Sequence, residues 1–247
     1  KTAYEIRNCD WSSDVCSSDL EPTAEKIEAL LEMEGPRTVR QAQQILAMVN
    51  QLARWVPRLS LSIPNIKKST SARTKFQWTD SMESEWVNMM EMMRSTVKIS
   101  PVNTELPLEL YTDASYQGIG FCLVQPRGGE IGVNNQKNII AVGSTGLSSA
   151  QSRYSPVEIE TLALAWACKK CDFYMRGARE VHLYTDCGAL RGMLVKNIGE
   201  VKNPRLSRML EDICYYNVVP HKIEGKSNSI ADFLSRKDKV KIGRAHV

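Results

Sequence analysis

The N-terminal part of the chain carries apolar positions at helical spacing. Within residues 24–33 apolar side chains recur every three or four positions between Glu and Lys, which predicts a helix. Gly35 and Pro36 then break the pattern. Thr38 is the predicted N-cap of a second helix, and Thr79 is that of a third, whose methionine stripe we assign to a helix core.

A polar stretch separates these helices. Residues 60–75 contain Pro64 and several basic side chains, and this composition predicts a linker. We therefore divide this part of the chain into a helical region at residues 21–60 and a connecting region with one helix at residues 61–106.

The second half of the chain begins with alternating apolar and polar positions, which are typical of strands. Strands are predicted at residues 108–112, 119–125 and 138–143, and together they suggest an antiparallel meander. Ser155 is the predicted cap of a long helix with proline at its first position. A further strand is predicted at residues 181–185.

The remaining elements complete an α/β pattern. Helices are predicted at residues 188–196 and 205–214, followed by a strand at 216–224 and a closing helix from residue 229. Since strands come first and a helix then crosses to another strand, we predict an α/β fold. It has a mixed five-stranded sheet with flanking helices, preceded by the small, mainly helical module.

Composition places the chain among ordinary globular proteins. Of its 247 residues 43% are hydrophobic and 24% are charged. No apolar run reaches the roughly 20 residues of a membrane span, and nothing resembles a secretory signal. Seven irregularly spaced cysteines indicate reduced thiols, so we expect an intracellular protein without a membrane partner. The net charge of +4 permits a nucleic-acid partner without demanding one.

Both ends of the chain look like translated sequencing adapter. The codons of an indexed adapter translate in order to CDWSSDVCSSDL at residues 9–20, and its outer part matches KTAYE at the start. IGRAHV at residues 242–247 matches the reverse complement of the same adapter. We expect residues 1–20 and 242–247 to be non-native and to contribute no packing, and we treat residues 237–247 as a tail.

Four acidic residues stand at the ends of predicted elements. Asp113 and Asp186 each end a strand in the sequence Tyr-Thr-Asp, so neighbouring strands would bring them to the same edge of a sheet. Glu160 lies on the intervening helix in a row of small apolar residues, whereas Glu158 has a more ordinary surface setting. Asp232 lies near the start of the closing helix. Clustered carboxylates would suit Mg²⁺ or Mn²⁺.

Specific motifs contain these acids. The stretches LELYTDASYQGIGFCLVQ, RYSPVEIETLALAWA, REVHLYTDCGAL and EGKSNSIADFLSR resemble, in order, the ribonuclease H domain of gypsy-type LTR retrotransposons. We assign residues 107–236 to such a domain. Upstream, RTVRQAQQILAMVNQLARWVP and FQWTDSMESEW resemble more loosely the reverse-transcriptase thumb and connection, which we assign to residues 21–60 and 61–106.

The resemblance implies a function and a site. It implies endonucleolytic hydrolysis of the RNA strand of RNA–DNA hybrids, with two Mg²⁺ or Mn²⁺ ions and a metal-activated water. It implies a Pol polyprotein with a polymerase upstream and an integrase downstream, in a cytoplasmic retroelement particle. The catalytic and metal-binding residues that it implies are Asp113, Glu160, Asp186 and Asp232.

The chain departs from the family at several points. Cys187 stands where the family usually has His after the second Thr-Asp, a change that we expect to be tolerated because that residue is not a ligand. The mobile histidine of cellular ribonucleases H is missing, and His221 is a weak replacement. The polymerase motif YxDD is absent, so we expect no DNA synthesis. Candidate phosphate contacts in the helical module are Arg37, Arg40, Arg54 and Arg58.

Two other functional classes remain open. One is a catalytically inactive, nucleic-acid-binding relic of the same domain, although all four acids are present. The other is an integrase-like nuclease, which shares the architecture. The position of Glu160 between the two strand acids argues against an integrase order of acids.

Overall fold

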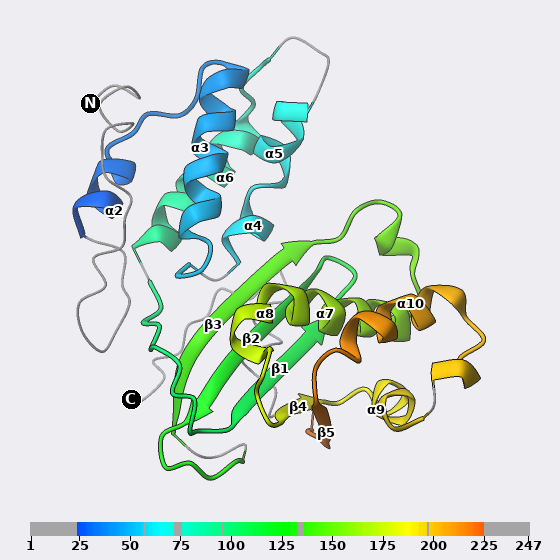
Figure 1. Cartoon of the computed structure of the whole chain (residues 1–247). Coiled ribbons are helices and arrows are strands. Elements are labelled where there is room, and N and C mark those ends of the chain that lie inside the picture. The colour runs from blue at the N-terminus through cyan, green and yellow to red at the C-terminus, as the bar shows by residue number, and fades with distance from the viewer. Residues whose placement is uncertain are drawn as a thin grey trace.

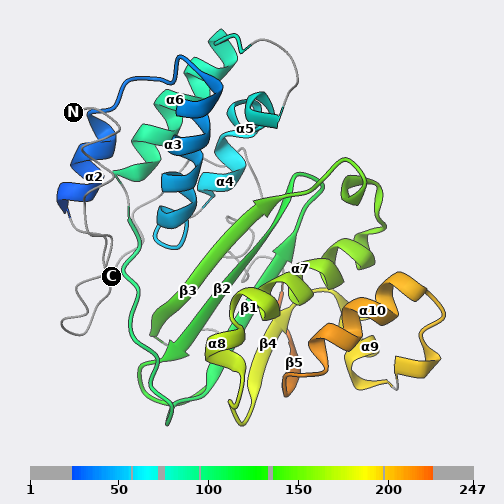
Figure 2. The same ribbon diagram turned by 45° about the horizontal axis from the view of Figure 1, so that its top comes forward.

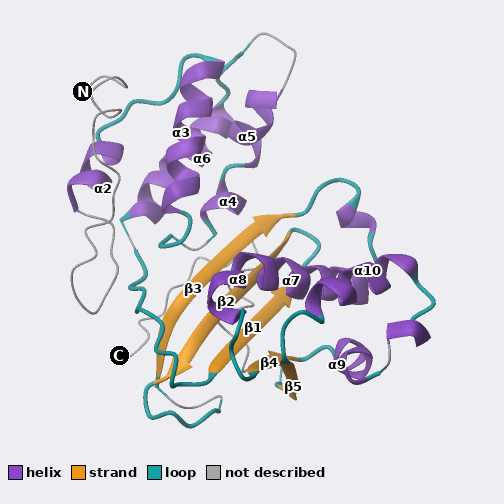
Figure 3. Ribbon diagram, viewed as in Figure 1, coloured by secondary structure: helices purple, strands orange, loops and turns teal. Residues whose placement is uncertain are grey.

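The computed structural model describes residues 24–56, 58–71, 76–94, 96–132, 136–196 and 198–224. These residues form a helical module beside a five-stranded sheet that carries helices on one face (Figures 1 and 3). Asp232 and both adapter-like ends lie outside the described residues, so the predictions made for them stay predictions. Among the helices of the described ranges, none has the length and apolar character to cross a membrane.

The helical module begins with helices that the sequence predicts. Its elements are α2 (Ala24–Leu31), α3 (Val39–Leu52), α4 (Leu59–Ser62), α5 (Pro64–Ser71) and α6 (Asp80–Met93). The side chains of Thr38 and Thr79 accept hydrogen bonds from the backbone N–H groups of Gln41 and Met82, which confirms both predicted N-caps. The methionine stripe packs inward, with Met89 and Met93 buried in the module's core.

The prediction of a linker at residues 60–75 was wrong, because α5 and all but the first residue of α4 lie within it. The side chains of Ile63 and Ile66 join the core of the module. Glu85 on α6 accepts hydrogen bonds from the backbone N–H groups of Asn65 and Ile66 at 3.0–3.1 Å, so its carboxylate caps the start of α5. The partner that stabilises this polar helix is twenty residues away in the sequence, where a local pattern does not reveal it.

The sheet has the strand order β3-β2-β1-β4-β5. Its strands are β1 (Leu108–Ala114), β2 (Gly118–Pro126), β3 (Lys137–Gly146), β4 (Val181–Thr185) and β5 (Val218–Lys222). The first three form the predicted antiparallel meander, while β4 pairs in parallel with both β1 and β5. The predicted mixed sheet is thereby confirmed.

The helices of the second half cover one face of this sheet, as Figures 1 and 2 show. They are α7 (Pro156–Lys170), α8 (Asp172–Met175), α9 (Gly188–Val195) and α10 (Pro204–Ile213), with short 3₁₀ turns at Gln151–Arg153 and Ile198–Glu200. Leu164 of α7 and Leu210 of α10 pack into one core with Leu110 and Leu183 of the central strands. This core fixes α7 across β1 and β2.

Glu158 differs from its prediction, because it is buried rather than a surface residue. It completes a capping box with Ser155 at the start of α7. Its carboxylate also accepts hydrogen bonds from Asn203 and Arg205 at the start of α10, at 3.1 and 2.7 Å. Glu158 therefore ties the first turns of the two helices together.

A buried ion pair holds the sheet's other face. The fully buried carboxylate of Glu109 on β1 is paired with the ammonium of Lys137 at the start of β3. The same carboxylate accepts hydrogen bonds from the hydroxyl of Tyr111 at 2.9 Å and from the backbone N–H of Gly132 at 2.8 Å. These contacts fasten the loop between β2 and β3 to the middle of the sheet.

Replacing Lys137 should show how much this ion pair contributes to the free energy of unfolding. We expect Lys137→Met to lower the free energy of unfolding by about 3–5 kcal/mol, because it leaves a buried carboxylate without a counter-charge. Urea denaturation of the full chain measures this change. Arg127→Met is the matched control. It removes an exposed cation from the same hairpin, whose guanidinium donates a hydrogen bond to Asn138, and should change stability by less than about 0.5 kcal/mol. An equal loss of unfolding free energy in the two variants would contradict a special role for the buried pair of Glu109 and Lys137.

Candidate metal centre

Three of the four predicted acids meet at one edge of the sheet. Asp113, Glu160 and Asp186 each offer a carboxylate oxygen, and these oxygens all lie within 4.8 Å of one another. Among the described residues, no other group of three acidic, histidine or cysteine side chains converges in this way. Asp232, the fourth predicted acid, lies outside the described residues.

Strand register explains why the two aspartates are neighbours. β1 and β4 run parallel, with Tyr111 opposite Tyr184. Two residues after these tyrosines, Asp113 lies next to the last residue of β1 and Asp186 directly follows β4, so both acids lie at the same end of the two strands. The two Tyr-Thr-Asp stretches of the sequence therefore lie side by side on neighbouring parallel strands.

Helix α7 supplies the third carboxylate. Its capping box at Ser155 fixes where the helix begins, and Glu160 follows within the next turn. Behind Glu160, the fully buried side chains of Ala163 and Leu164 pack against the sheet. Small residues let the helix lie close enough for Glu160 to reach β1.

Exposure rises across the site. Asp113 is buried, Glu160 is half-buried and Asp186 is exposed. A cation bound between them would keep one side open to solvent and to a substrate, as catalytic metal sites require.

The electrostatics of the cluster are dominated by repulsion and burial. Burial, and then the charges of Asp113 and Asp186, raise the pKa of Glu160 from its ordinary 4.5 to about 8. The backbone N–H of Ala114 donates a hydrogen bond to this carboxylate, which lowers the pKa in part. The Oε2 atom of Glu160 is buried without a hydrogen-bond partner among the described residues. A divalent cation fits this set of donors, because it would bind the orphaned oxygen and neutralise the cluster.

Cys187, which departs from the family pattern, has a structural role next to the site. It is the N-cap of α9, and its sulfur accepts a hydrogen bond from the backbone N–H of Leu190 at 3.4 Å. Its own N–H donates to the hydroxyl of Thr185 at 3.1 Å. The residue therefore shapes the turn after Asp186 and lies outside the three-carboxylate cluster.

His221 faces other side chains of the sheet. Its Nε2 lies 2.9 Å from Nδ1 of His182 on β4, and its ring stacks on Tyr184 with centroids 5.1 Å apart. Burial and the neighbouring His182 lower the pKa of His221. Through these contacts His221 packs β5 against β4.

The predicted phosphate contacts of the helical module divide into two groups. Arg37, Arg40 and Arg54 are exposed. Arg58, the fourth candidate, is buried, with a backbone φ of 66° at the start of α4, and its burial argues against the predicted phosphate contact. A left-handed conformation is uncommon for arginine, so there was no reason in the sequence to expect it here.

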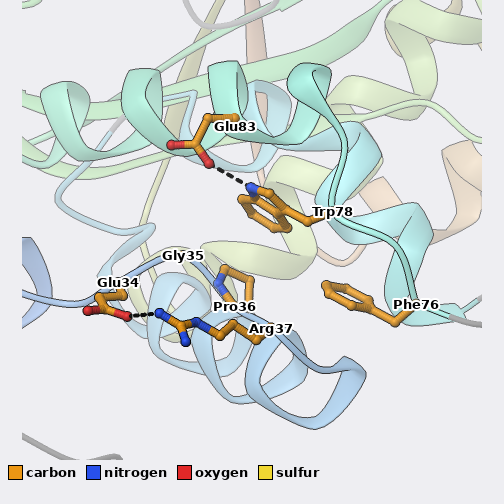
Figure 4. Close-up of a pocket in the computed structure, with 7 residues that line it drawn as sticks. All are labelled: Glu34, Gly35, Pro36, Arg37, Phe76, Trp78 and Glu83. Atoms are coloured by element: carbon orange, nitrogen blue, oxygen red, sulfur yellow. Dashed lines mark hydrogen bonds and ion pairs between the residues drawn. The ribbon is translucent and has the colours of Figure 1, made fainter.

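A pocket of about 380 Å³ lies on the helical module, apart from the carboxylates. Figure 4 shows Phe76 and Trp78 on one side of it and Pro36 on the other. Arg37 at its rim pairs with Glu34 at 2.7 Å, and Trp78 donates a hydrogen bond to Glu83 at 2.6 Å. The charge of Arg37 is thus already matched, which makes it the weakest of the three exposed candidates.

Sequence comparison relates the chain to retroelement proteins. Residues 103–216 match the family model of the RNase H-like domain found in reverse transcriptase. The Retrovirus-related Pol polyprotein from transposon opus of Drosophila melanogaster is 26% identical over 233 residues, which cover 90% of this chain and 22% of that protein. The transposon Tf2-3 polyprotein of Schizosaccharomyces pombe is 26% identical over 218 residues, covering 87% of this chain and 16% of that protein. The chain thus spans about a fifth of the curated relatives that it matches, and the similarity extends into the helical module.

Structural comparison supports the same relationship at the level of the fold. The foamy viral protease-reverse transcriptase in complex with RNA/DNA hybrid superposes with a TM-score of 0.70 and 17% identity, over 91% of this chain and 30% of that one. The version in complex with double-stranded DNA gives a TM-score of 0.67 at 17% identity, over 83% and 42%. Residues 103–216 are therefore an RNase H-like domain of the reverse-transcriptase type, in a chain homologous to transposon Pol polyproteins.

Proposed function

We propose that the protein is a metal-dependent ribonuclease that cuts the RNA strand of RNA–DNA hybrids internally. The observation that carries the proposal is the buried oxygen of Glu160, which has no hydrogen-bond partner among the described residues and lies within a cluster of three carboxylates. Such a cluster costs stability unless a cation binds it, and it occupies the edge of the sheet in an RNase H-like domain.

Each acid has a defined part in the proposed site. Asp113, which lies deepest, would hold the two Mg²⁺ or Mn²⁺ ions together with Glu160, Asp186 and Asp232. When bound, the ions supply an activated water and stabilise charge on the phosphate oxygens. The chain itself orients the ligands: the N–H of Ala114 holds Glu160, and the turn built on Thr185 and Cys187 directs the backbone after Asp186.

The similarity to Pol polyproteins and to a reverse transcriptase in complex with RNA/DNA hybrid supports a proposal for the partners. We propose the RNA–DNA hybrid as substrate and the remainder of a Pol polyprotein, with polymerase upstream and integrase downstream, as covalent context in a cytoplasmic particle. The division into thumb-like residues 21–60, connection residues 61–106 and the nuclease domain at residues 107–236 belongs to the same proposal. Similarity along the helical module supports it.

Cleavage of a labelled hybrid by the full chain tests the function. We expect Mg²⁺-dependent cuts in the RNA strand, none in EDTA, and loss of cleavage in Asp113→Asn with hybrid binding kept or improved, because less negative charge faces the phosphates. An inactive relic would bind the hybrid without cutting it in any metal. Cleavage by Asp113→Asn at the wild-type rate would show that the site is wrongly assigned.

The raised pKa of Glu160 predicts a pH-dependent stability. Without metal, the protonated carboxyl contributes stability that is fully present below 4.5 and is lost as the pH rises through about 8. Glu160→Gln, which stays neutral, should therefore melt higher than the wild type above that pH. Mn²⁺ should stabilise the wild type increasingly as the pH rises and leave Glu160→Gln nearly unchanged. Thermal melts across the pH range, with and without Mn²⁺, measure both effects, and parallel curves for the two proteins would refute the assignment.

Exposed arginines of the helical module should contribute to hybrid affinity. We expect Arg40→Ala and Arg54→Ala each to weaken binding for every hybrid sequence and to reduce the slope of log Kd against log salt by about 1. Arg94→Ala is the control, because this exposed arginine of the same module already pairs with Glu91. Fluorescence anisotropy in a salt series gives the slopes, and identical slopes in all proteins would mean that the module makes no phosphate contacts there.

A further inference from the structure

One leucine of the helical module contacts the sheet and not the module's own core. Leu59 of α4 and Ile63 directly after this helix pack into the core of the module, whereas Leu61 between them is buried outside it. Figures 1 and 2 both place α4 beside the end of β3, and α4 and β3 are in contact. Leu61 therefore lies at the junction of the two parts of the chain.

The surface that receives Leu61 is the hairpin between β1 and β2. A Cβ atom added to Gly118 would lie 2.6 Å from a methyl carbon of Leu61 and 2.8 Å from the carbonyl oxygen of Thr145. One added to Gly146, which pairs with Gly118 across the sheet, would lie 3.7 Å from the same methyl carbon. Two glycines thus form a recess that the leucine fills, which is a close approach that glycine permits.

This hairpin is a stiff turn. The backbone N–H of Ser115 donates to the carbonyl of Gly118 at 2.8 Å. Its hydroxyl accepts hydrogen bonds from the N–H groups of Gln117 and Gly118, both at 3.2 Å. The carbonyl of Gln117 accepts from the N–H of Leu147 after β3, at 3.4 Å. A displacement at Gly118 would therefore move the whole turn.

The turn leads directly into the metal centre. Asp113 and Ala114 immediately precede Ser115, and they pair with Gly120 and Ile119 on β2. Asp113 supplies the deepest carboxylate, and Ala114 donates its backbone N–H to Glu160. Two of the three carboxylates are thus positioned by the strand that leads into the turn at Gly118, where Leu61 packs.

We propose that Leu61 is a positioning residue for the metal centre. By filling the recess at Gly118 and Gly146, it couples the docking of α4 to the placement of Asp113 and of the Ala114 N–H. The helical module then sets the metal affinity of the nuclease domain, in addition to any contact that it makes with nucleic acid. This inference rests on the proposed function, because it needs the carboxylates to bind metal.

Mn²⁺ binding to the full chain without nucleic acid tests the coupling. We expect Leu61→Ala to raise the Mn²⁺ dissociation constant roughly tenfold, the size of effect seen when groups that orient metal ligands are removed. In hybrid cleavage, kcat should fall at limiting Mn²⁺ and recover at high Mn²⁺, while KM for the hybrid stays unchanged. Titration followed by the electron paramagnetic resonance of free Mn²⁺ gives the constants.

Leu59→Ala is the matched control. It removes the same side chain from the same short helix, but from the side that faces the module's core. It should lower thermal stability and leave the Mn²⁺ dissociation constant unchanged. Leu61→Met, which refills the recess, should restore wild-type binding, and Leu61→Val is the milder variant to use if Leu61→Ala does not fold.

The outcomes separate this inference from the proposed function. If the wild type binds Mn²⁺ and cuts hybrid, but Leu61→Ala or Leu61→Val binds Mn²⁺ as tightly as the wild type, only the coupling is overturned. The same holds if Leu59→Ala weakens Mn²⁺ binding equally, because general destabilisation then explains the change. If the wild type binds no Mn²⁺, the proposed function and the coupling fail together.

Discussion

Mutual repulsion between three carboxylates is the constraint around which this domain is built. Asp113, Glu160 and Asp186 hold oxygens within 4.8 Å of one another, an arrangement that isolated side chains would avoid. The energy that keeps them together comes from elsewhere. Parallel pairing of β1 with β4 fixes the aspartates, and the apolar core under α7 fixes the glutamate. The pKa of Glu160 is about 8, so without metal this carboxyl is protonated at lower pH, which relieves part of the repulsion.

Local patterns were sufficient to predict most of the fold. Alternation predicted the strands, and Thr38, Thr79 and Ser155 predicted helix starts, because an N-cap acts within three residues of its helix. The Tyr-Thr-Asp repeat located two site residues, since a strand that ends in an acid places it at the edge of the sheet. Each of these signals is contained in a short stretch of sequence.

What the sequence did not reveal depends on contacts between distant residues. Helix α5 is polar and looked like a linker, because its stabilising carboxylate, Glu85, belongs to another helix. Glu158 looked like a surface residue, because Asn203 and Arg205 approach it from α10. The contact of Leu61 with the β1–β2 hairpin is of the same kind. Pairings of this type follow from the assembled fold, so no local period predicts them.

The buried glutamates show how a structural acid differs from a functional one. Glu85 and Glu109 have their carboxylate oxygens occupied, by helix N–H groups in one case and by Lys137, Tyr111 and Gly132 in the other. Each of these side chains stabilises the fold without needing a ligand.

Glu158 and Glu160 make the contrast within a single turn of α7. Hydrogen bonds from Ser155, and then from Asn203 and Arg205, lower the pKa of Glu158 to about 2. Two residues later, burial and two neighbouring acids raise the pKa of Glu160 to about 8, and one of its oxygens has no hydrogen-bond partner in the part of the chain that the structure describes. The helix is the same and the side chains are identical, so only the surroundings separate the two. Burying a carboxylate oxygen without a hydrogen-bond partner costs stability, and a bound cation is a partner that offsets this cost. This difference, rather than the presence of acids as such, is why we place the chemistry at Glu160 and its neighbours.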